Sequence, residues 1–283
     1  MTESRQQNVK SLTIAGAVLD YEVVDLSPPW ADPVATVLFQ HGIGTDLGIW
    51  TDWLPILASR FRLVRFSMRG CGVNATPFEL EGCTLDRLSK DLLTIADAVK
   101  APRFHVIAES FGGTVSLHTA LCEPQRVQSL TLMSTPYRGA AVEPVAHWLR
   151  YTESAEGMIQ WNDEMMVGRF KPDAVSDRAL QWFRRTQERT SASVLRHFAH
   201  LVAGADLTQR LAALQIPTLL IVGDSSPYVG LGQLAALHKL LPHTRVQVIP
   251  HAAHGIAFSH AQTCSSSFLE FVATTDKSSS FLP

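Results

Sequence analysis

Three short segments of the sequence carry residues that together could perform nucleophilic catalysis. The first is 108–113 (AESFGG), which follows a strand-like run at 104–108 and precedes a helical pattern that begins near Thr114. Small residues two positions on either side of a serine permit the sharp strand-to-helix turn that presents a nucleophilic hydroxyl. The helix N-terminus that follows favours negative charge developing there. We therefore predict that Ser110 is a nucleophile held in such an elbow.

The second segment follows the last strand-like run, 245–249, and contains His251 and His254. A base that removes the Ser110 proton must come from a loop at the same edge of the sheet. We predict His254 for this role because it lies where the loop should turn back over the serine. His251 is interpreted as a residue of the loop wall.

The third segment, 39–44 (FQHGIG), directly follows a buried strand-like run. Attack on an acyl carbon creates an oxyanion that needs two N–H donors already in place. We predict the backbone N–H groups of Ile43 and Phe111 as this oxyanion hole. His41 could brace the loop or contact the substrate, and we take it as a candidate substrate-binding residue.

The remaining pattern indicates a doubly wound, mostly parallel sheet that would position these three segments at one edge. Two alternating segments, 11–14 and 18–24, predict an N-terminal hairpin. Nearly continuous apolar runs typical of buried parallel strands occupy 34–39, 61–66, 104–108, 127–133, 217–222 and 245–249. Helical patterns separate them at 50–59, 85–99, 114–123, 231–241 and 261–274, and Thr84 is placed to cap the second helix.

The interval 137–210 has no strand-like run and is rich in tryptophan and methionine at helical spacings. We predict a helical cap inserted into a core domain made of residues 1–136 and 211–283. A cap over the carboxyl edge of a sheet lies where ligands bind in this architecture. Three of its aromatic residues are therefore candidate substrate-binding residues: Trp148, Trp161 and Trp182.

On these motifs the chain resembles the α/β-hydrolase superfamily over 12–272. The matching stretches are His41-Gly42 with the downstream Trp50, 68–72 (MRGCG), 108–113 (AESFGG), 216–223 (IPTLLIVG) and 249–254 (IPHAAH). The resemblance implies an α/β-hydrolase fold with a Ser-acid-His triad under a helical cap. It places the nucleophile at Ser110 and the base at His254.

The acid departs from the family pattern, which places it three residues after the glycine that ends the strand. That position is Ser226, whereas Asp224 comes one residue after Gly223. We predict that Asp224 reaches His254 from a rearranged loop. Two alternatives stay open: the acid is another carboxylate, such as Glu109 or Asp206, or the chemistry needs none.

Composition places few other constraints on function. Hydrophobic residues make up 46% and charged residues 18% of the chain, and the formal net charge of −2 favours neither nucleic acid nor an acidic membrane as a partner. The N-terminus lacks the apolar core of a signal peptide, so we expect a soluble, cytoplasmic protein. The four cysteines have no CxxC spacing, and the His197/His200 and His251/His254 pairs have no third ligand beside them. We expect neither a metal nor a cofactor. We expect a small-molecule substrate, and the sequence also admits a homodimer.

The sequence therefore predicts a serine hydrolase of the carboxylesterase or lactonase type, acting on a medium-sized apolar or aromatic molecule through an acyl-serine intermediate. The resemblance also admits carbon-carbon bond hydrolases and cofactor-free oxygenases of aromatic catabolism. A non-catalytic protein that binds a small ligand is a further alternative, motivated by the missing acid. Dehalogenases and epoxide hydrolases need an aspartate nucleophile, and position 110 is a serine.

Overall fold

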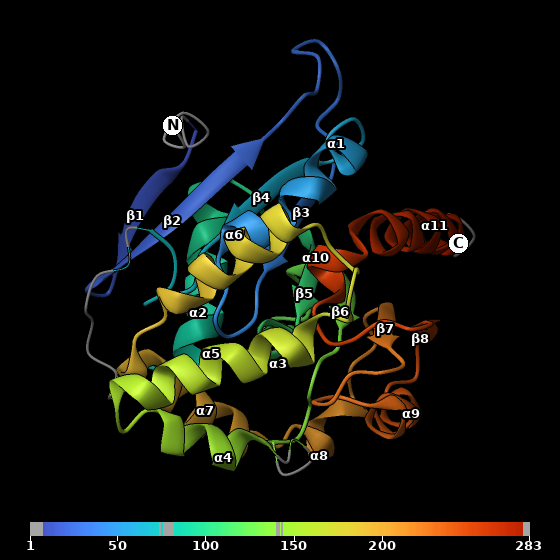
Figure 1. Ribbon diagram of the computed structural model, residues 1–283. Helices are drawn as coiled ribbons and strands as arrows, with labels where there is room; N and C mark the ends of the chain where they lie inside the picture. Colours follow the sequence, from blue (N-terminus) through green and yellow to red (C-terminus); the bar gives the residue numbers. More distant parts are fainter. Residues whose placement is uncertain (1–7, 74, 76–81, 140–141, 143, 280–283) are drawn as a thin grey trace.

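An eight-stranded sheet forms the centre of the computed structural model, which describes residues 8–73, 75, 82–139, 142 and 144–279 (Figure 1). The strand order is β1-β2-β4-β3-β5-β6-β7-β8. β1 and β2 form the predicted antiparallel hairpin, β2 is antiparallel to β4, and every later pairing is parallel. The strands are β1 Lys10–Ile14, β2 Ala17–Val24, β3 Thr36–Gln40, β4 Arg62–Phe66, β5 Phe104–Glu109, β6 Val127–Met133, β7 Thr218–Gly223 and β8 Thr244–Ile249.

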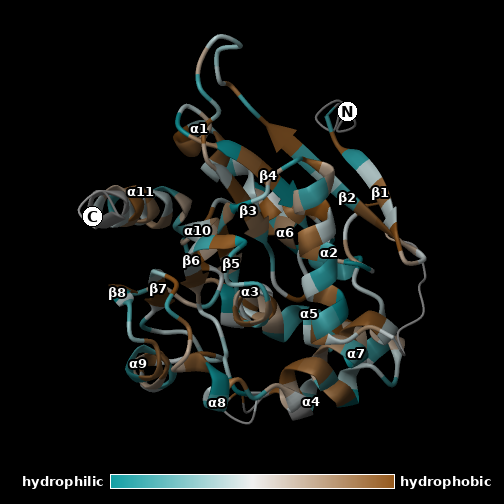
Figure 2. Ribbon diagram, turned by 180° about the vertical axis from the view of Figure 1, so that it is seen from behind, coloured by the Kyte–Doolittle hydropathy of each residue, from teal (hydrophilic) through white to brown (hydrophobic). Residues whose placement is uncertain are grey.

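Helices cover both faces of the sheet, because successive side chains of each strand point to opposite faces. On β3, Leu38 packs into a core shared with α2, α3 and α9, whereas Val37 and Phe39 pack into a second core with α11 and the turn after β3. Figure 2 shows hydrophobic and hydrophilic residues alternating around these helices. The helices are η1 Leu47–Trp53, α1 Leu54–Leu57, α2 Leu85–Ala98, α3 Phe111–Cys122, α9 Leu231–Leu240, α10 Ile256–Ser259 and α11 Ala261–Ser279.

The predicted elements are present, with three differences in detail. The helix expected at 50–59 is a 3₁₀ helix followed by one α-turn, since Pro55 lies at the start of α1 and has no N–H to continue the first helix. α3 begins at Phe111 rather than near Thr114. β8 lies at the edge of the sheet, so it is not buried on both faces, and Val246 and Val248 are exposed. The N-cap role of Thr84 is confirmed by its hydrogen bond from the Arg87 N–H at 3.2 Å.

The described part of the segment between β6 and β7 contains the helices α4 Pro144–Tyr151, α5 Ala155–Arg169, α6 Asp177–Glu188, α7 Ala192–Gly204 and α8 Thr208–Leu211, joined by loops. α4 packs against α5 and α7, and α5 against α6. A third hydrophobic cluster joins these helices to the carboxyl edge of the sheet, with Phe111 of α3 5.3 Å from Phe198 of α7 between ring centroids. The insertion thus lies over the predicted catalytic segments. The division into core and cap stays a prediction, and residues 1–7, 74, 76–81, 140–141, 143 and 280–283 of those ranges lie outside the described residues.

Close backbone contact between the start of α3 and the loop after β3 fixes how near these two segments lie at the carboxyl edge of the sheet. A Cβ atom added at Gly112 would lie 2.3 Å from the His41 carbonyl oxygen and 2.5 Å from that of Gln40. These obstacles are backbone atoms of a buried strand end, which cannot rotate away as a flexible side chain can. Position 112 therefore requires glycine if the elbow and the loop are to touch.

We expect Gly112→Ala to lower the free energy of unfolding by about 1–3 kcal/mol, the usual range for overpacking a core. Gly232→Ala is the control, because its added methyl meets nothing within 4 Å on helix α9 and should stabilise the protein by about 0.5–1 kcal/mol. Urea unfolding curves of both variants provide the measurement. Equal stability of the two variants would contradict the argument for close contact.

Candidate active site

Ser110 occupies a strained turn between β5 and α3. Its φ of 55° and ψ of −127° lie outside the regions that non-glycine residues favour, and such strain is maintained only where the surroundings enforce it. The Ser110 N–H donates to the Met133 carbonyl at 2.8 Å, which ties the turn to β6. The structure therefore places the predicted nucleophile in the sharp bend expected from its neighbours.

His254 lies within hydrogen-bond distance of Ser110. The distance from His254 Nε2 to Ser110 Oγ is 2.9 Å. The end of helix α5 holds the loop that carries His254. The His254 N–H donates to the Gly168 carbonyl, and the Gly255 N–H donates to the Arg169 carbonyl. His251, the rival base, is exposed and at a φ of 57° on the turn that precedes this loop.

The other ring nitrogen of His254 contacts a hydroxyl and not a carboxylate. His254 Nδ1 lies 3.1 Å from Ser226 Oγ, and the same oxygen accepts a hydrogen bond from the Val229 N–H at 3.2 Å. A carboxylate can only accept from Nδ1, which fixes the proton there, whereas a hydroxyl can donate or accept. The third position of the arrangement is therefore filled by a neutral group with weaker control of the imidazole tautomer.

Asp224 does not contact His254, contrary to the prediction from sequence. Its N–H continues the β7–β8 ladder by donating to the Ile249 carbonyl at 3.1 Å. Its exposed carboxylate accepts hydrogen bonds from the Ser225 hydroxyl and from the His251 backbone, which hold the pKa of Asp224 below its usual value. The chain turns only after this residue, so the side chain that comes beside the imidazole is the one at position 226.

The two other carboxylates considered from sequence also lie elsewhere. Glu109 is buried, and its Oε1 accepts a hydrogen bond from the Ala257 N–H at 2.9 Å. Asp206 pairs with Arg138 through a β-bridge at the base of the insertion and accepts from the Thr208 N–H. Neither forms a hydrogen bond with His254 within the described part of the chain.

The two residues predicted for the oxyanion hole lie on segments that touch beside Ser110. Phe111 is the first residue of α3, and Ile43 follows Gly42, whose added Cβ would lie 3.0 Å from Ser110 Cβ. The Ile43 carbonyl accepts a hydrogen bond from Arg169 Nη2 at 2.5 Å. That bond fixes the peptide plane of the loop from the inserted helices.

His41 braces this loop and has no nitrogen free for a substrate. It is fully buried, its Nδ1 lies 2.8 Å from the Gly42 carbonyl, and its Nε2 accepts from the Met68 N–H at 2.8 Å. Burial lowers the pKa of His41 to about 4, so the ring is neutral at physiological pH. The structure thus contradicts the choice of His41 as a substrate-binding residue and supports the bracing alternative.

The three candidate tryptophans divide into two groups. Trp148 and Trp161 belong to the hydrophobic cluster that also contains Ile43 and Phe111. Trp182 lies apart from that cluster and stacks on Phe258 of α10, with ring centroids 5.5 Å apart and an interplanar angle of 14°. Trp182 therefore packs α6 onto the core, and contact with a substrate at Ser110 stays a prediction only for the first two.

Arg169 and Tyr228 are site residues that the sequence analysis did not identify. The Tyr228 ring lies edge-on to the His254 ring with centroids 5.0 Å apart, and the centroid of the Trp148 ring lies 5.8 Å from that of Tyr228. Arg169 is fully buried at the end of α5. No motif signalled either residue; the only available signal for Arg169 was a lone arginine followed by Phe170 within an otherwise apolar stretch.

Burial and charge both act on the base. Desolvation, followed by the positive charge of Arg169, lowers the pKa of His254 to about 3. Desolvation raises the pKa of Glu109 to about 7, against the effects of its hydrogen bond from Ala257 and of the Arg169 charge. The imidazole is therefore neutral at physiological pH, as a general base must be, but its protonated form is poorly stabilised.

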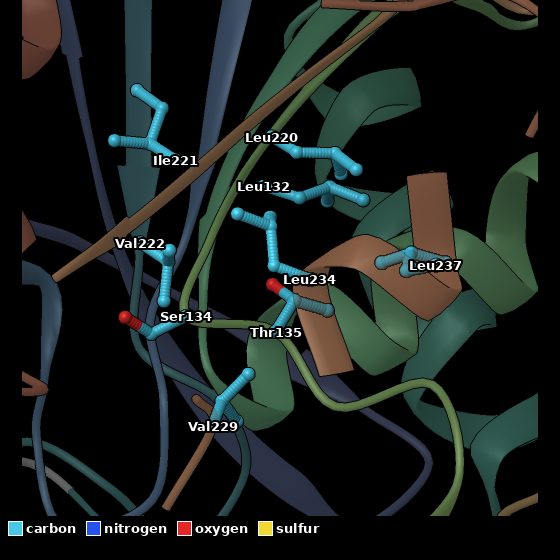
Figure 3. Close-up of a pocket in the computed structure, with 9 residues that line it drawn as sticks. All are labelled: Leu132, Ser134, Thr135, Leu220, Ile221, Val222, Val229, Leu234 and Leu237. Atoms are coloured by element: carbon cyan, nitrogen blue, oxygen red, sulfur yellow. The ribbon is translucent and has the colours of Figure 1, made fainter. Parts of the chain in front are cut away.

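Two other features lie apart from Ser110 and His254. A small cavity, drawn in Figure 3, lies between β6, β7 and α9 and is lined mainly by leucine and valine, with Ser134 and Thr135 at one side. Elsewhere Asp86, His118 and Cys122 have ligand atoms within 4.8 Å of one another, but Arg210 Nη2 lies 3.5 Å from the Cys122 sulfur and places a positive charge there. The cysteines are free thiols, and no described helix is long and apolar enough to cross a membrane.

Because the group beside His254 Nδ1 is a hydroxyl, introducing a carboxylate at that position should raise the pKa of His254 measurably. Ser226→Asp should raise that pKa by more than one unit, because an adjacent negative charge favours the imidazolium. Asp224→Asn, the control, should leave it near the wild-type value. NMR titration of labelled histidine, assigned with His254→Ala, provides the measurement. A wild-type His254 that titrates between about pH 5 and 8 would contradict the expected neutral base.

Comparison with known proteins shows the family to which the chain belongs. Residues 35–261 match the family described as the alpha/beta hydrolase fold. The 3-oxoadipate enol-lactonase 1 of Acinetobacter baylyi is 26% identical over 201 residues, covering 68% of this chain and 71% of the relative. The pimeloyl-[acyl-carrier protein] methyl ester esterase of Nitrosomonas europaea is 27% identical over 228 residues, covering 77% and 88%.

Solved structures show the same architecture. A hydrolase from Pseudomonas aeruginosa superimposes with a TM-score of 0.83 at 27% identity, over 94% of this chain and 98% of that one. The resemblance and fold predicted from the sequence are both confirmed, since the family match spans strands β3 to β8, the helices between β6 and β7, and the His254 loop. The chain belongs to the alpha/beta hydrolase fold family.

Proposed function

We propose that this hydrolase-family protein is a serine hydrolase that cleaves a carboxylic ester or lactone through an acyl intermediate on Ser110. The observation that carries the proposal is the 2.9 Å approach of His254 Nε2 to Ser110 Oγ at a strained elbow. The base is within reach of the proton that it would remove. A serine that served only to cap α3 would need neither the strain nor the imidazole.

The reaction would proceed in two halves. His254 Nε2 takes the proton of Ser110 as Oγ attacks the acyl carbon, and the N–H groups of Ile43 and Phe111 would stabilise the oxyanion. Collapse of the tetrahedral intermediate breaks the bond to the leaving oxygen, which takes the proton from Nε2. Water then attacks the acyl-serine with His254 as base, and Ser110 recovers its proton.

Ser226 would replace the usual carboxylate as the positioning residue of the base. The Ser226 hydroxyl oxygen can accept a hydrogen bond from the Nδ1–H of His254. The hydrogen bond from the Val229 N–H holds that oxygen in place. The hydroxyl adds no negative charge to offset the imidazolium that forms during each half of the reaction. We therefore propose a slow enzyme whose rate depends mainly on the elbow and the oxyanion hole.

The relatives and the insertion support the substrate class. The two relatives named above are, by name, an enol-lactonase and a methyl ester esterase, and both names denote hydrolysis of a carboxylic ester linkage. Trp148 and Trp161 belong to the apolar cluster beside the oxyanion loop. We propose that they face the body of a medium-sized apolar or aromatic substrate.

A ligand-binding protein without turnover is the second candidate, favoured by the neutral partner of His254. A fluorophosphonate probe separates the two candidates, because it reacts only with an activated serine. We expect rapid labelling of the wild type and none of Ser110→Ala, together with a loss of about 10³-fold or more in ester turnover. The control is Ser116→Ala, a serine of α3 whose hydroxyl donates to the Gly112 carbonyl. Equal labelling or turnover of wild type and Ser110→Ala would refute the acyl-serine mechanism.

Installing the carboxylate should accelerate the enzyme. We expect Ser226→Asp to raise kcat on a neutral ester by about 10- to 100-fold, a part of the ~10⁴-fold effect of such a carboxylate in a well-studied serine protease. Asp224→Asn should retain wild-type turnover within about twofold, because that carboxylate touches neither reacting group. Steady-state kinetics provide the test. A strong loss in Asp224→Asn would return the acid role to Asp224.

A further inference from the structure

A buried guanidinium beside the site has an unused hydrogen-bond donor. Arg169 is 2% exposed; its Nε donates to Gln187 Oε1 at 2.9 Å and its Nη2 to the Ile43 carbonyl at 2.5 Å. One face of the group is covered by the Phe183 ring, whose centroid lies 5.2 Å from Cζ. Nη1 is also buried but meets no acceptor within the part of the chain that the structure describes.

The positive charge of Arg169 has little compensation. Both of its hydrogen-bond acceptors are neutral oxygens, and no carboxylate of the described residues forms an ion pair with it. Glu109 acts on it only through charge, and burial keeps that carboxyl partly protonated near neutral pH. A buried cation without a counter-ion is strongly unfavourable, so proteins rarely keep one that has no ligand.

The guanidinium adjoins each part of the catalytic arrangement. Nη2 holds the loop that carries the Ile43 N–H, and the Arg169 carbonyl holds the Gly255 N–H next to the base. The charge of Arg169 also acts on His254 and Tyr228, whose rings are in contact. A ligand that reached Nη1 would therefore lie within the same site as a substrate bound at Ser110.

A second unpaired donor is carried by the same helix, α5. The Trp161 indole is 1% exposed, and its Nε1 meets no acceptor among the described residues. A Cβ added at Gly44 would lie 2.8 Å from Trp161 Cη2 and 3.4 Å from Arg169 Nη2, so the two side chains border the same glycine of the oxyanion loop. One free cationic donor and one free neutral donor are thus presented from one helix.

We propose that Arg169, assisted by Trp161, binds a free carboxylate of the substrate. This inference rests on the proposed function and narrows it: the substrate is an ester or lactone whose apolar or aromatic body carries a second, ionised carboxyl group. A charge-assisted hydrogen bond from a guanidinium to a carboxylate is among the stronger polar contacts in proteins. Nη1 would donate to one oxygen of that carboxylate, and Trp161 Nε1 is a second unpaired donor on the same helix.

Such a substrate would also supply the charge that position 226 lacks. A carboxylate bound at Arg169 would offset the positive charge that disfavours protonation of His254. The imidazolium formed in each half of the reaction would then be less destabilised. The anionic substrate would gain in both binding and turnover, whereas a neutral ester would gain in neither.

Two matched substrate pairs test the proposal, one with the carboxylate on the alcohol side and one on the acyl side. These are 4-acetoxybenzoate against its methyl ester, and the monophenyl ester of an aliphatic dicarboxylic acid against the phenyl ester of the monocarboxylic acid of equal length. In at least one pair we expect the wild type to favour the anionic member by about 10- to 100-fold in kcat/KM after subtraction of spontaneous hydrolysis. Equal rates within both pairs would overturn the proposal.

Variants of Arg169 distinguish recognition of the substrate carboxylate from support of the oxyanion loop. Arg169→Gln should bring the preference close to one, and Arg169→Lys should restore part of it by returning the charge. Arg184→Gln, an exposed arginine of α6 paired with Asp163, should keep the full preference. If Arg169→Gln slows both members of each pair equally, Arg169 only positions the loop and the proposal is wrong.

A binding measurement distinguishes failure of this proposal from failure of the proposed function. Calorimetric titration of Ser110→Ala with 4-acetoxybenzoate and with its methyl ester requires no turnover. Tighter binding of the carboxylate that is lost in Ser110→Ala/Arg169→Gln supports the anion site even if the wild type proves inactive. Equal affinity for both compounds, and for the two members of the acyl-side pair titrated in the same way, rejects the anion site even if the wild type is a good esterase.

Discussion

The hydrogen bond between Ser110 and His254 joins segments that are 144 residues apart in the chain, and most of the architecture serves to hold it. The tight turn between β5 and the glycines of α3 places Ser110 at the carboxyl edge of the sheet. The loop that carries His254 begins at the end of β8, at the same edge. The insertion adds a third constraint, since two carbonyls at the end of α5 accept the N–H groups of His254 and Gly255. Movement of that helix would therefore move the base.

Electrostatics distinguish this site from one with a carboxylate behind the base. His254 faces a hydroxyl on one side and the field of a buried arginine on another, and both leave its protonated form without support. The neutral form is thereby secured across the physiological pH range, but stabilisation of the imidazolium must come from elsewhere. A bound anion would balance the positive charge of Arg169, because no described side chain provides an acceptor for its Nη1.

Local patterns in the sequence were sufficient to predict the sheet, the elbow and the pairing of Ser110 with His254. Buried parallel strands appear as continuous apolar runs, and the edge where their carboxyl ends meet follows from their order. The strand–turn–helix context of Ser110 likewise lies within about a dozen neighbouring residues. The Asp224 prediction failed because it assumed that the loop after Gly223 rearranges to bring a carboxylate to the base. The Asp224 N–H instead continues the β7–β8 ladder, and position 226 keeps the place beside the imidazole that the family pattern gives it.

The role of Arg169 could not be assigned from the sequence, because it depends on how helix α5 packs over the oxyanion loop, 126 residues away in the chain. Arg169 has no motif, and in a helical pattern it resembles any arginine that ends a helix near its negative pole. Only packing shows that it is buried between Phe183 and the oxyanion loop rather than solvated. On the function proposed above, the elbow and the base that would carry the reaction are recognisable in local sequence, whereas selection of the substrate would be encoded by contacts between distant segments.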